Sequence, residues 1–187
     1  MVKKKACIFI SGNGSNLKNI ILRSRDVSFP ITVSLVICNN KSAKGINYAK
    51  KFKIPYVFVY IKNKSDEKKI LLNLKKFKIS FICLAGYMKI LSKKVTNEFK
   101  KRIINIHPSL LPNFKGLNTY SRILKNKEKK TGCTVHYVNE KLDDGDIIIK
   151  KSFYVSPNDD LITLKRKTQQ QEYKAYPEAI IKIFRNR

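Results

Sequence analysis

The sequence is poor in acidic residues: the 187-residue chain has 13 Asp and Glu against 40 Lys and Arg, a formal net charge of +27 at pH 7. Such a deficit suggests a nucleic acid or an anionic membrane surface as a partner. However, 33 of the 40 cations are Lys, accompanied by 24 Ile and 16 Asn, and these three residues share A/T-rich codons. Arg, the usual reader of phosphates and guanines, is scarce, and the Lys residues are dispersed. We therefore favour mutational bias over a nucleic-acid function.

Paired cysteines and long apolar runs are also missing. The four cysteines have neither the spacing of a zinc site nor a Cys-x-x-C motif. Each lies in an apolar run, so we expect small buried side chains in a reducing cytosol. No run approaches the ~20 apolar residues of a membrane span, and the first one ends at Ile10, too early for a signal peptide. We expect a cytoplasmic protein with no membrane partner.

Strand-like apolar runs alternate with helical periodicity along most of the chain. The expected strands are residues 6–10, 31–38, 56–61, 81–85, 103–106, 133–138 and 147–155. The expected helices begin near Asn16 and cover 43–52, 67–77, a segment through Val95 and Phe99, 120–124 and 161–184. This alternation predicts an α/β fold, a doubly wound and mostly parallel sheet with helices on both faces. Because only residues 139–146 separate the last two strands, we expect part of the sheet to be antiparallel.

Ligands of such sheets bind beyond the carboxyl ends of the strands. We therefore expect residues 11–16, 84–91, 105–116 and 139–146 to line one rim. Residues 12–16 (Gly-Asn-Gly-Ser-Asn) follow a strand and open a helix, an arrangement that favours an anion, and Ser15 or Asn16 is available to cap the helix. Leu17 stands where a dinucleotide motif has its third glycine, so a phosphate monoester fits better than NAD. A simple turn that uses glycines for positive φ is the alternative.

Histidine occurs only twice in the chain. His107 follows Asn105 by two residues at the end of an expected strand, so both side chains lie on one face. An Asn amide can donate to a developing oxyanion, and an imidazole can move a proton near neutral pH. The alternative for His107 is a ring satisfied by backbone groups at a strand end. We expect His136, within a later strand, to be structural or to support the site.

Three of the 13 acidic residues share one loop, at Asp143, Asp144 and Asp146. A tight turn explains Asp-Gly alone, and a divalent metal explains clustered Asp, although the spacing of a calcium loop is absent. The third interpretation is a carboxylate that orients a histidine or holds a water.

Four segments together resemble one known family. They are residues 11–17 (SGNGSNL), 84–91 (LAGYMKIL), 105–112 (NIHPSLLP) and 132–145 (GCTVHYVNEKLDDG). Their order and spacing are similar to those of the phosphoribosylglycinamide formyltransferases, folate-dependent enzymes of purine biosynthesis, from residue 6 to about 184. The Asn-x-His-Pro segment with the later Asp-x-Gly is specific to transferases and hydrolases that use formyl folates.

The resemblance implies a Rossmann-like formyltransferase domain. Its reaction transfers a formyl group from 10-formyltetrahydrofolate to the amine of N1-(5-phospho-D-ribosyl)glycinamide through a tetrahedral intermediate, without a metal. Asn105 and His107 would stabilise the oxyanion, and Asp143 would fix the imidazole and a water that relays the amine proton. The implied ribonucleotide-binding residues are Gly14, Ser15, Asn16, Gln169, Gln170, Gln171 and Glu172. The implied folate-binding residues are Met88, Lys89, Ile90, Leu91, Asn105, Asn139, Glu140, Lys141, Leu142 and Asp143.

The resemblance also implies a single domain over residues 1–187, with a phosphate-binding half of about 1–100 and a folate and catalytic half of about 101–187. We expect two small-molecule substrates as partners, no specific nucleic acid, and a monomer or weak homodimer. Lys89 stands where some relatives carry Arg, and residues 64–68 offer no clear counterpart of their folate-side Arg.

Two related activities remain as alternatives, methionyl-tRNA formyltransferase and formyltetrahydrofolate hydrolase. The positive charge favours the first. Against them, we expect no tRNA-binding domain after residue 187 and no regulatory domain before the first strand, and the turn at 12–16 suits a small phosphorylated substrate.

Overall fold

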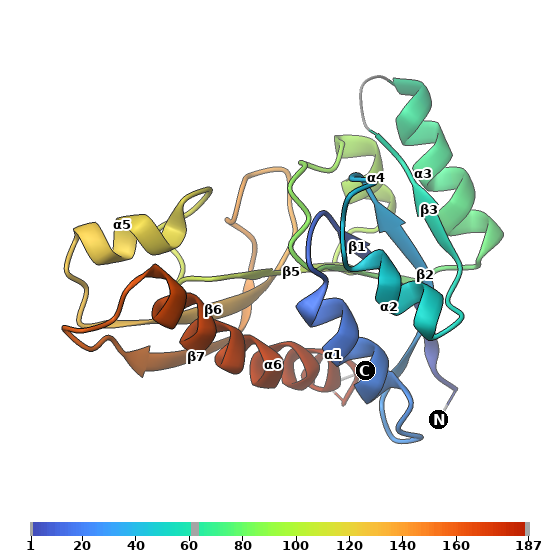
Figure 1. Ribbon diagram of the computed structural model, residues 1–187. Helices are drawn as coiled ribbons and strands as arrows, with labels where there is room; N and C mark the ends of the chain where they lie inside the picture. The colour runs from blue at the N-terminus through green and yellow to red at the C-terminus, as the bar shows by residue number, and fades with distance from the viewer. Residues whose placement is uncertain (1, 61–63, 186–187) are drawn as a thin grey trace. The chain divides into compact units, whose positions relative to one another are not determined.

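The computed structural model describes residues 2–60 and 64–185. The chain divides into two compact units, Met1–Ile104 and Asn105–Arg187 (Figure 1). We describe each by itself. Ile61, the last residue of an expected strand, lies outside the described residues.

Four strands that pair in parallel make up the sheet of the first unit. They are β1 (Lys4–Ile10), β2 (Ile31–Cys38), β3 (Tyr56–Phe58) and β4 (Phe81–Leu84), in the spatial order β3-β2-β1-β4. Strand β1 pairs in parallel with both β2 and β4, and β2 pairs in parallel with β3. The helices of this unit are α1 (Ser15–Ser24), α2 (Ile46–Lys51), α3 (Lys64–Lys76) and α4 (Lys93–Glu98).

Helices cover both faces of these strands, which explains their apolar sequences. All residues of β1 from Ala6 to Ile10 are buried, as is every residue of β4. Connections between parallel strands are right-handed, so α1 and α2, which follow strands stepping in one direction, lie on one face. The chain then returns from β3 to β4 in the opposite direction, which places α3 on the other face (Figure 1).

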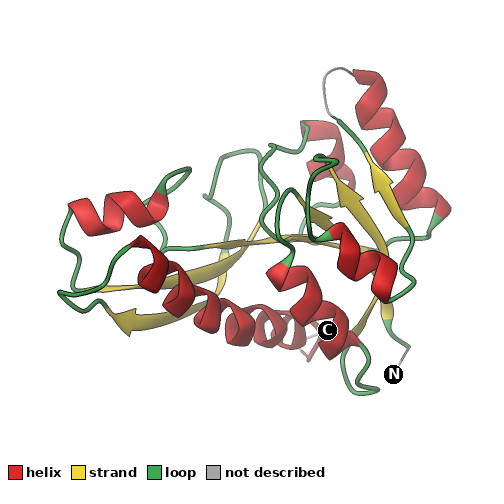
Figure 2. Ribbon diagram, in the orientation of Figure 1, coloured by secondary structure: helices red, strands yellow, loops and turns green. Residues whose placement is uncertain are grey.

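Strand β5 (Ile103–His107) follows β4 in the strand order, and its last three residues begin the second unit. This unit adds α5 (Thr119–Lys125), β6 (Lys130–Tyr137), β7 (Ile147–Tyr154) and α6 (Leu161–Arg185). Strands β6 and β7 pair in antiparallel fashion, and α6 packs against both (Figure 2). The α/β prediction and the antiparallel prediction for the last strands are therefore confirmed.

Two local predictions have different outcomes. The four cysteines are free and buried, as expected. The cap predicted for the first helix is wrong: Gly14 is the N-cap residue, with φ 71°, and no side chain caps the helix. Because Gly14 takes the left-handed conformation, Ser15 and Asn16 fall inside the first helical turn rather than before it.

Candidate active site

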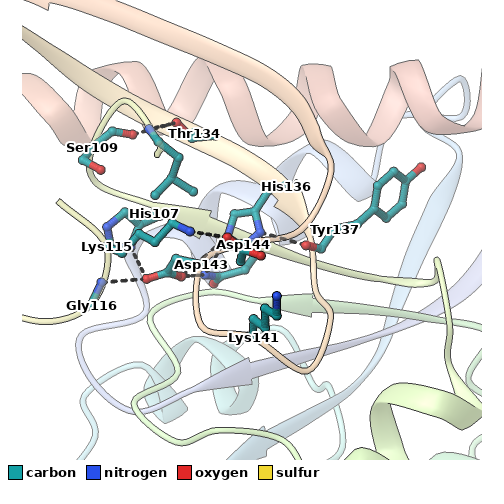
Figure 3. Close-up of polar contacts among 12 residues, drawn as sticks. His107, Ser109, Lys115, Gly116, Thr134, His136, Tyr137, Lys141, Asp143 and Asp144 are labelled. Carbon is teal, nitrogen blue, oxygen red and sulfur yellow. Dashed lines mark hydrogen bonds and ion pairs between the residues drawn. The ribbon is translucent and has the colours of Figure 1, made fainter. Parts of the chain in front are cut away.

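His107 lies at the end of β5, beside Asp143 (Figure 3), and has a contact at each ring nitrogen. Nε2 is 2.8 Å from the Phe114 carbonyl oxygen, and Nδ1 is 3.2 Å from Asp143 Oδ2. Since a carbonyl oxygen only accepts hydrogen bonds, Nε2 carries a proton. The site therefore presents Nδ1 to the carboxylate, and a proton placed there would lie between imidazole and carboxylate.

Burial and the neighbouring acceptors act in opposite directions on this imidazole. Burial lowers the pKa of His107, while the Phe114 carbonyl and the Asp143 carboxylate partly offset that effect. Only 7% of the His107 side chain and 6% of the Asp143 side chain are exposed. Such a ring can exist neutral near pH 7 and still receive a proton from a reacting group.

The Asp143 carboxylate contacts the other polar groups of the cluster. Its Oδ2 accepts a hydrogen bond of 2.9 Å from the Gly116 N–H, and its Oδ1 lies 3.4 Å from Asn105 Nδ2 and 3.6 Å from His136 Nε2. Burial raises the pKa of Asp143, but the neighbouring His136, the hydrogen bond from the Gly116 N–H and the nearby His107 imidazole outweigh it, so the pKa lies below its ordinary value. The carboxylate is therefore ionised at neutral pH.

His136 and Asn105 support each other on the β6 side of the cluster. The His136 Nδ1 donates to the Tyr137 carbonyl oxygen at 2.8 Å, which leaves the Nε2 lone pair to accept from Asn105 Nδ2 at 3.3 Å. A register shift between Val135 and His136 in the β6–β7 pairing marks a bulge next to this ring. Both contacts of the Asn105 amide are long, so an acceptor on a substrate can replace either of them.

The neighbouring Asp144 has a different environment. It is exposed and pairs with Lys115, whereas Asp143 is buried. Asp143 has φ +49°, and this left-handed conformation turns its side chain into the cluster. Of the alternatives for this loop, the geometry favours a carboxylate that orients a histidine. Within residues 2–60 and 64–185, no group of three or more His, Cys, Asp or Glu side chains is arranged to hold a metal ion.

In the first unit, the glycine-rich turn leads into the N-terminus of α1. The first turn of α1 has no acidic residue, so the positive end of the helix is not neutralised there. A Cβ on Gly14 would lie 2.6 Å from the Gly45 Cα, and the Gly45 N–H donates to the Gly12 carbonyl oxygen at 3.0 Å. The turn is thus held by close backbone contacts at the N-terminus of α1, a position in the fold that favours an anion.

The segment after β4 is attached to this turn. Ser11 Oγ accepts from the Met88 N–H at 2.7 Å, and the Ser11 N–H donates to the Gly86 carbonyl oxygen. Met88 and Ile90 are mostly exposed, while Leu91 is buried. The structure therefore brings together two of the predicted rim segments, 11–16 and 84–91, within the first unit. Contacts between Gly116 and Asp143 bring together the other two, 105–116 and 139–146, within the second.

The other predicted binding residues of the second unit differ in exposure. Asn139, Glu140, Lys141 and Leu142 are exposed. On α6, Gln170 is exposed and Glu172 is buried. Four consecutive helical residues point in four directions, whereas Gln169 and Glu172, three residues apart, share a face. These are the two residues of the 169–172 segment that lie on one face of α6.

Three contacts of the cluster were not predicted from the sequence. They are the Phe114 carbonyl on His107, the Gly116 N–H on Asp143, and the Thr134 hydroxyl, which binds the loop after β5. The first two are backbone groups of residues at positive φ, and the residue type at Phe114 gives no indication of that conformation. For the third contact, Thr134, a buried polar residue two positions before His136, is the residue that could have indicated it.

The fold agrees with comparisons to known proteins. The family model described as formyl transferase matches residues 4–180. The chain therefore belongs to the formyl transferase family.

The similar proteins carry a more specific name. The chain is 40% identical over 185 residues to a phosphoribosylglycinamide formyltransferase of Haemophilus influenzae, covering 97% of this chain and 87% of the relative. It superimposes on the crystal structure of phosphoribosylglycinamide formyltransferase from Anaplasma phagocytophilum with a TM-score of 0.91 and 36% identity, covering 99% of this chain and 89% of that chain. The enzyme of that name from Bacillus halodurans gives a TM-score of 0.92 at 34% identity, covering 97% and 95%. Among the described residues, no helix is long and apolar enough to cross a membrane.

Proposed function

We propose that this protein transfers the formyl group of 10-formyltetrahydrofolate to the amine of glycinamide ribonucleotide, a step of purine biosynthesis. The observation that carries the proposal is the buried His107–Asp143 pair with the Asn105 amide beside it. An imidazole held by an ionised carboxylate can move a proton, and an amide donor can stabilise an oxyanion, in acyl transfer to an amine. The names of the similar proteins support the same substrates.

The proposed chemistry needs no covalent enzyme intermediate. The substrate amine attacks the formyl carbon, a C–N bond forms, and the carbonyl oxygen becomes an oxyanion that Asn105 and a protonated or proton-sharing His107 stabilise. The amine loses a proton, which a water held by Asp143 relays, and N10 of the folate takes up a proton as its bond to the formyl carbon breaks. Asp143 keeps the His107 ring in place throughout, because it contacts Nδ1.

The ribonucleotide is proposed to bind through its phosphate. Gly14, Ser15 and Asn16 present the N-terminus of α1, where backbone N–H groups and the helix dipole favour a dianion. On α6, we assign the ribonucleotide first to the pair Gln169 and Glu172, and extend the assignment to Gln170 and Gln171.

The folate is proposed to bind the segments 88–91 and 139–143. Exposed Met88, Ile90 and Leu142 offer apolar surface to an aromatic ring system. The glutamate tail of the folate is anionic, so the excess of Lys increases its capture, and this effect weakens as salt rises. We propose no metal in the reaction.

The test is a parallel assay of the purified protein with 10-formyltetrahydrofolate and two acceptors, glycinamide ribonucleotide and methionyl-tRNA. We expect the ribonucleotide to be formylated and the tRNA to remain unmodified. Formylation of methionyl-tRNA alone, or release of formate at the same rate with no acceptor present, would contradict the proposal.

A further inference from the structure

The loop between β5 and α5 is tied to strand β6 by one buried hydroxyl group. Thr134 Oγ1 donates to the Ser109 carbonyl oxygen at 2.7 Å and accepts from the Leu111 N–H at 3.1 Å (Figure 3). Thr134 and Ser109 are both fully buried. A single side chain therefore satisfies one donor and one acceptor of a loop that has left the sheet.

A series of hydrogen bonds connects these Thr134 contacts to His107. Ser109 Oγ donates to the Asn113 carbonyl oxygen at 2.5 Å, and the Asn113 N–H donates to the Leu110 carbonyl oxygen at 3.2 Å. The next residue, Phe114, has φ +57°, and its carbonyl oxygen accepts from His107 Nε2 at 2.8 Å. The position of that carbonyl depends on the loop that Thr134 holds.

We propose that Thr134 is a positioning residue for formyl transfer: by binding Ser109 and Leu111 it fixes the loop whose Phe114 carbonyl holds the His107 ring. This inference rests on the proposed function for its effect on catalysis, but the effect on the ring follows from the contacts alone. Thr134 itself does not contact the imidazole. Its hydroxyl acts through five residues of the loop.

The substitution Thr134→Val tests the hydroxyl, because valine has nearly the same shape. It leaves the Ser109 carbonyl and the Leu111 N–H without their partner in a buried place, so the loop must move to find others. Thr134→Ser keeps the hydroxyl. Thr131→Val is the matched control, since Thr131 is also buried on β6 but lies three residues away and hence on the opposite face of the strand.

The readout that a merely structural role would not move is the state of the His107 ring. With two histidines in the chain, nitrogen NMR of the imidazoles gives two sets of signals. We expect Thr134→Val to shift the His107 Nε2 signal and lower the His107 pKa, because the Phe114 carbonyl that raises it is displaced. The other groups that act on this ring stay unchanged: Asp143 from its loop, His136 from β6 and Arg122 from α5.

Formyl transfer is measured on the same variants. We expect Thr134→Val to lower kcat by about 10- to 100-fold, the range expected for misplacing a catalytic group by a fraction of an ångström to one ångström, with little change in either KM. Thr134→Ser should restore kcat and the ring signals, and Thr131→Val should retain both. Should Thr134→Val fail to fold, Ser109→Ala breaks the next link of the series and should shift the same Nε2 signal.

Two results would overturn the inference. One is a folded Thr134→Val protein whose His107 signals and pKa match those of the parent. The other is a loss of kcat that is equal in Thr134→Val and Thr131→Val. If the parent transfers no formyl group while Thr134→Val still moves the His107 signals, the tie to the ring is supported and the proposed function fails.

Discussion

Replacing Asp143 by Asn perturbs the cluster with little change in shape. An Asn at this position keeps an oxygen for the Gly116 N–H and for the proton that His107 receives on Nδ1 during transfer, but both bonds then have a neutral acceptor instead of a charged one. The other oxygen becomes an NH₂ group that faces the NH₂ of Asn105 at a distance of 3.4 Å in the parent. The variant thus weakens two bonds and sets two donors against each other.

The magnitude follows from these three changes. Exchanging a charged for a neutral acceptor costs about 1–1.5 kcal/mol per hydrogen bond, and a buried donor without an acceptor costs about 1–3 kcal/mol. The sum is roughly 3–6 kcal/mol, which corresponds to about 10²- to 10⁴-fold in kcat if it is expressed in the transition state.

Initial rates of formyl transfer to glycinamide ribonucleotide measure this effect. Asp144→Asn is the matched control, because Asp144 is exposed and its Lys115 partner lies at the surface. We expect Asp144→Asn to turn over at nearly the parental rate. Turnover of Asp143→Asn close to that of the parent, or a crippled Asp144→Asn, would refute the assignment of the orienting carboxylate.

Three further predictions concern the turn, acid stability and charge. Gly14→Ala should lower the free energy of unfolding in urea by about 2 kcal/mol or more, because φ is +71° and the new Cβ meets the Gly45 backbone. Gly12→Ala is the control and should leave urea unfolding unchanged, because its Cβ meets nothing within 4 Å. Because the folded-state pKa of His107 is lowered, its contribution to stability is present above the ordinary imidazole pKa of about 6.5 and is lost as the pH falls through the folded value. Urea unfolding of His107→Gln should therefore show a weaker loss of stability below pH 6.5, and a pH dependence equal to that of the parent would contradict this. Binding to nucleic acid should be weak, sequence-independent and abolished by salt in a titration, and tight sequence-selective binding at physiological salt would contradict the view that the charge is background.

The alternation of strands and helices could be predicted because burial on both faces leaves a direct mark on the sequence. The range 31–38 was predicted for β2, and the structure has Ile31–Cys38. Strand β6 was predicted less well, as 133–138 instead of Lys130–Tyr137, because its first residue, Lys130, is exposed and polar. Helix ends were less accurate for the same reason: the first turn of α3 carries Asp66 and Glu67, not apolar residues.

For the site, side chains with a chemical signature could be predicted and backbone partners could not. Asn105, His107 and Asp143 are predicted from residue type and motif, and the structure brings Asn105 and His107 each within reach of the Asp143 carboxylate. The Phe114 carbonyl and the Gly116 N–H depend on loop conformation, which no side chain of the motif determines. The assignment of their catalytic and binding roles stays a prediction until the variants are assayed.

The central claim is that His107 acts in the transfer of a formyl group to glycinamide ribonucleotide. The most direct measurement follows an isotope-labelled formyl group from 10-formyltetrahydrofolate in single-turnover reactions of the parent and of His107→Ala. We predict that the parent places the label on the amine of the ribonucleotide and that His107→Ala does so about 10²- to 10³-fold more slowly while remaining folded. Label recovered as formate, or equal rates for the two proteins, would contradict the account.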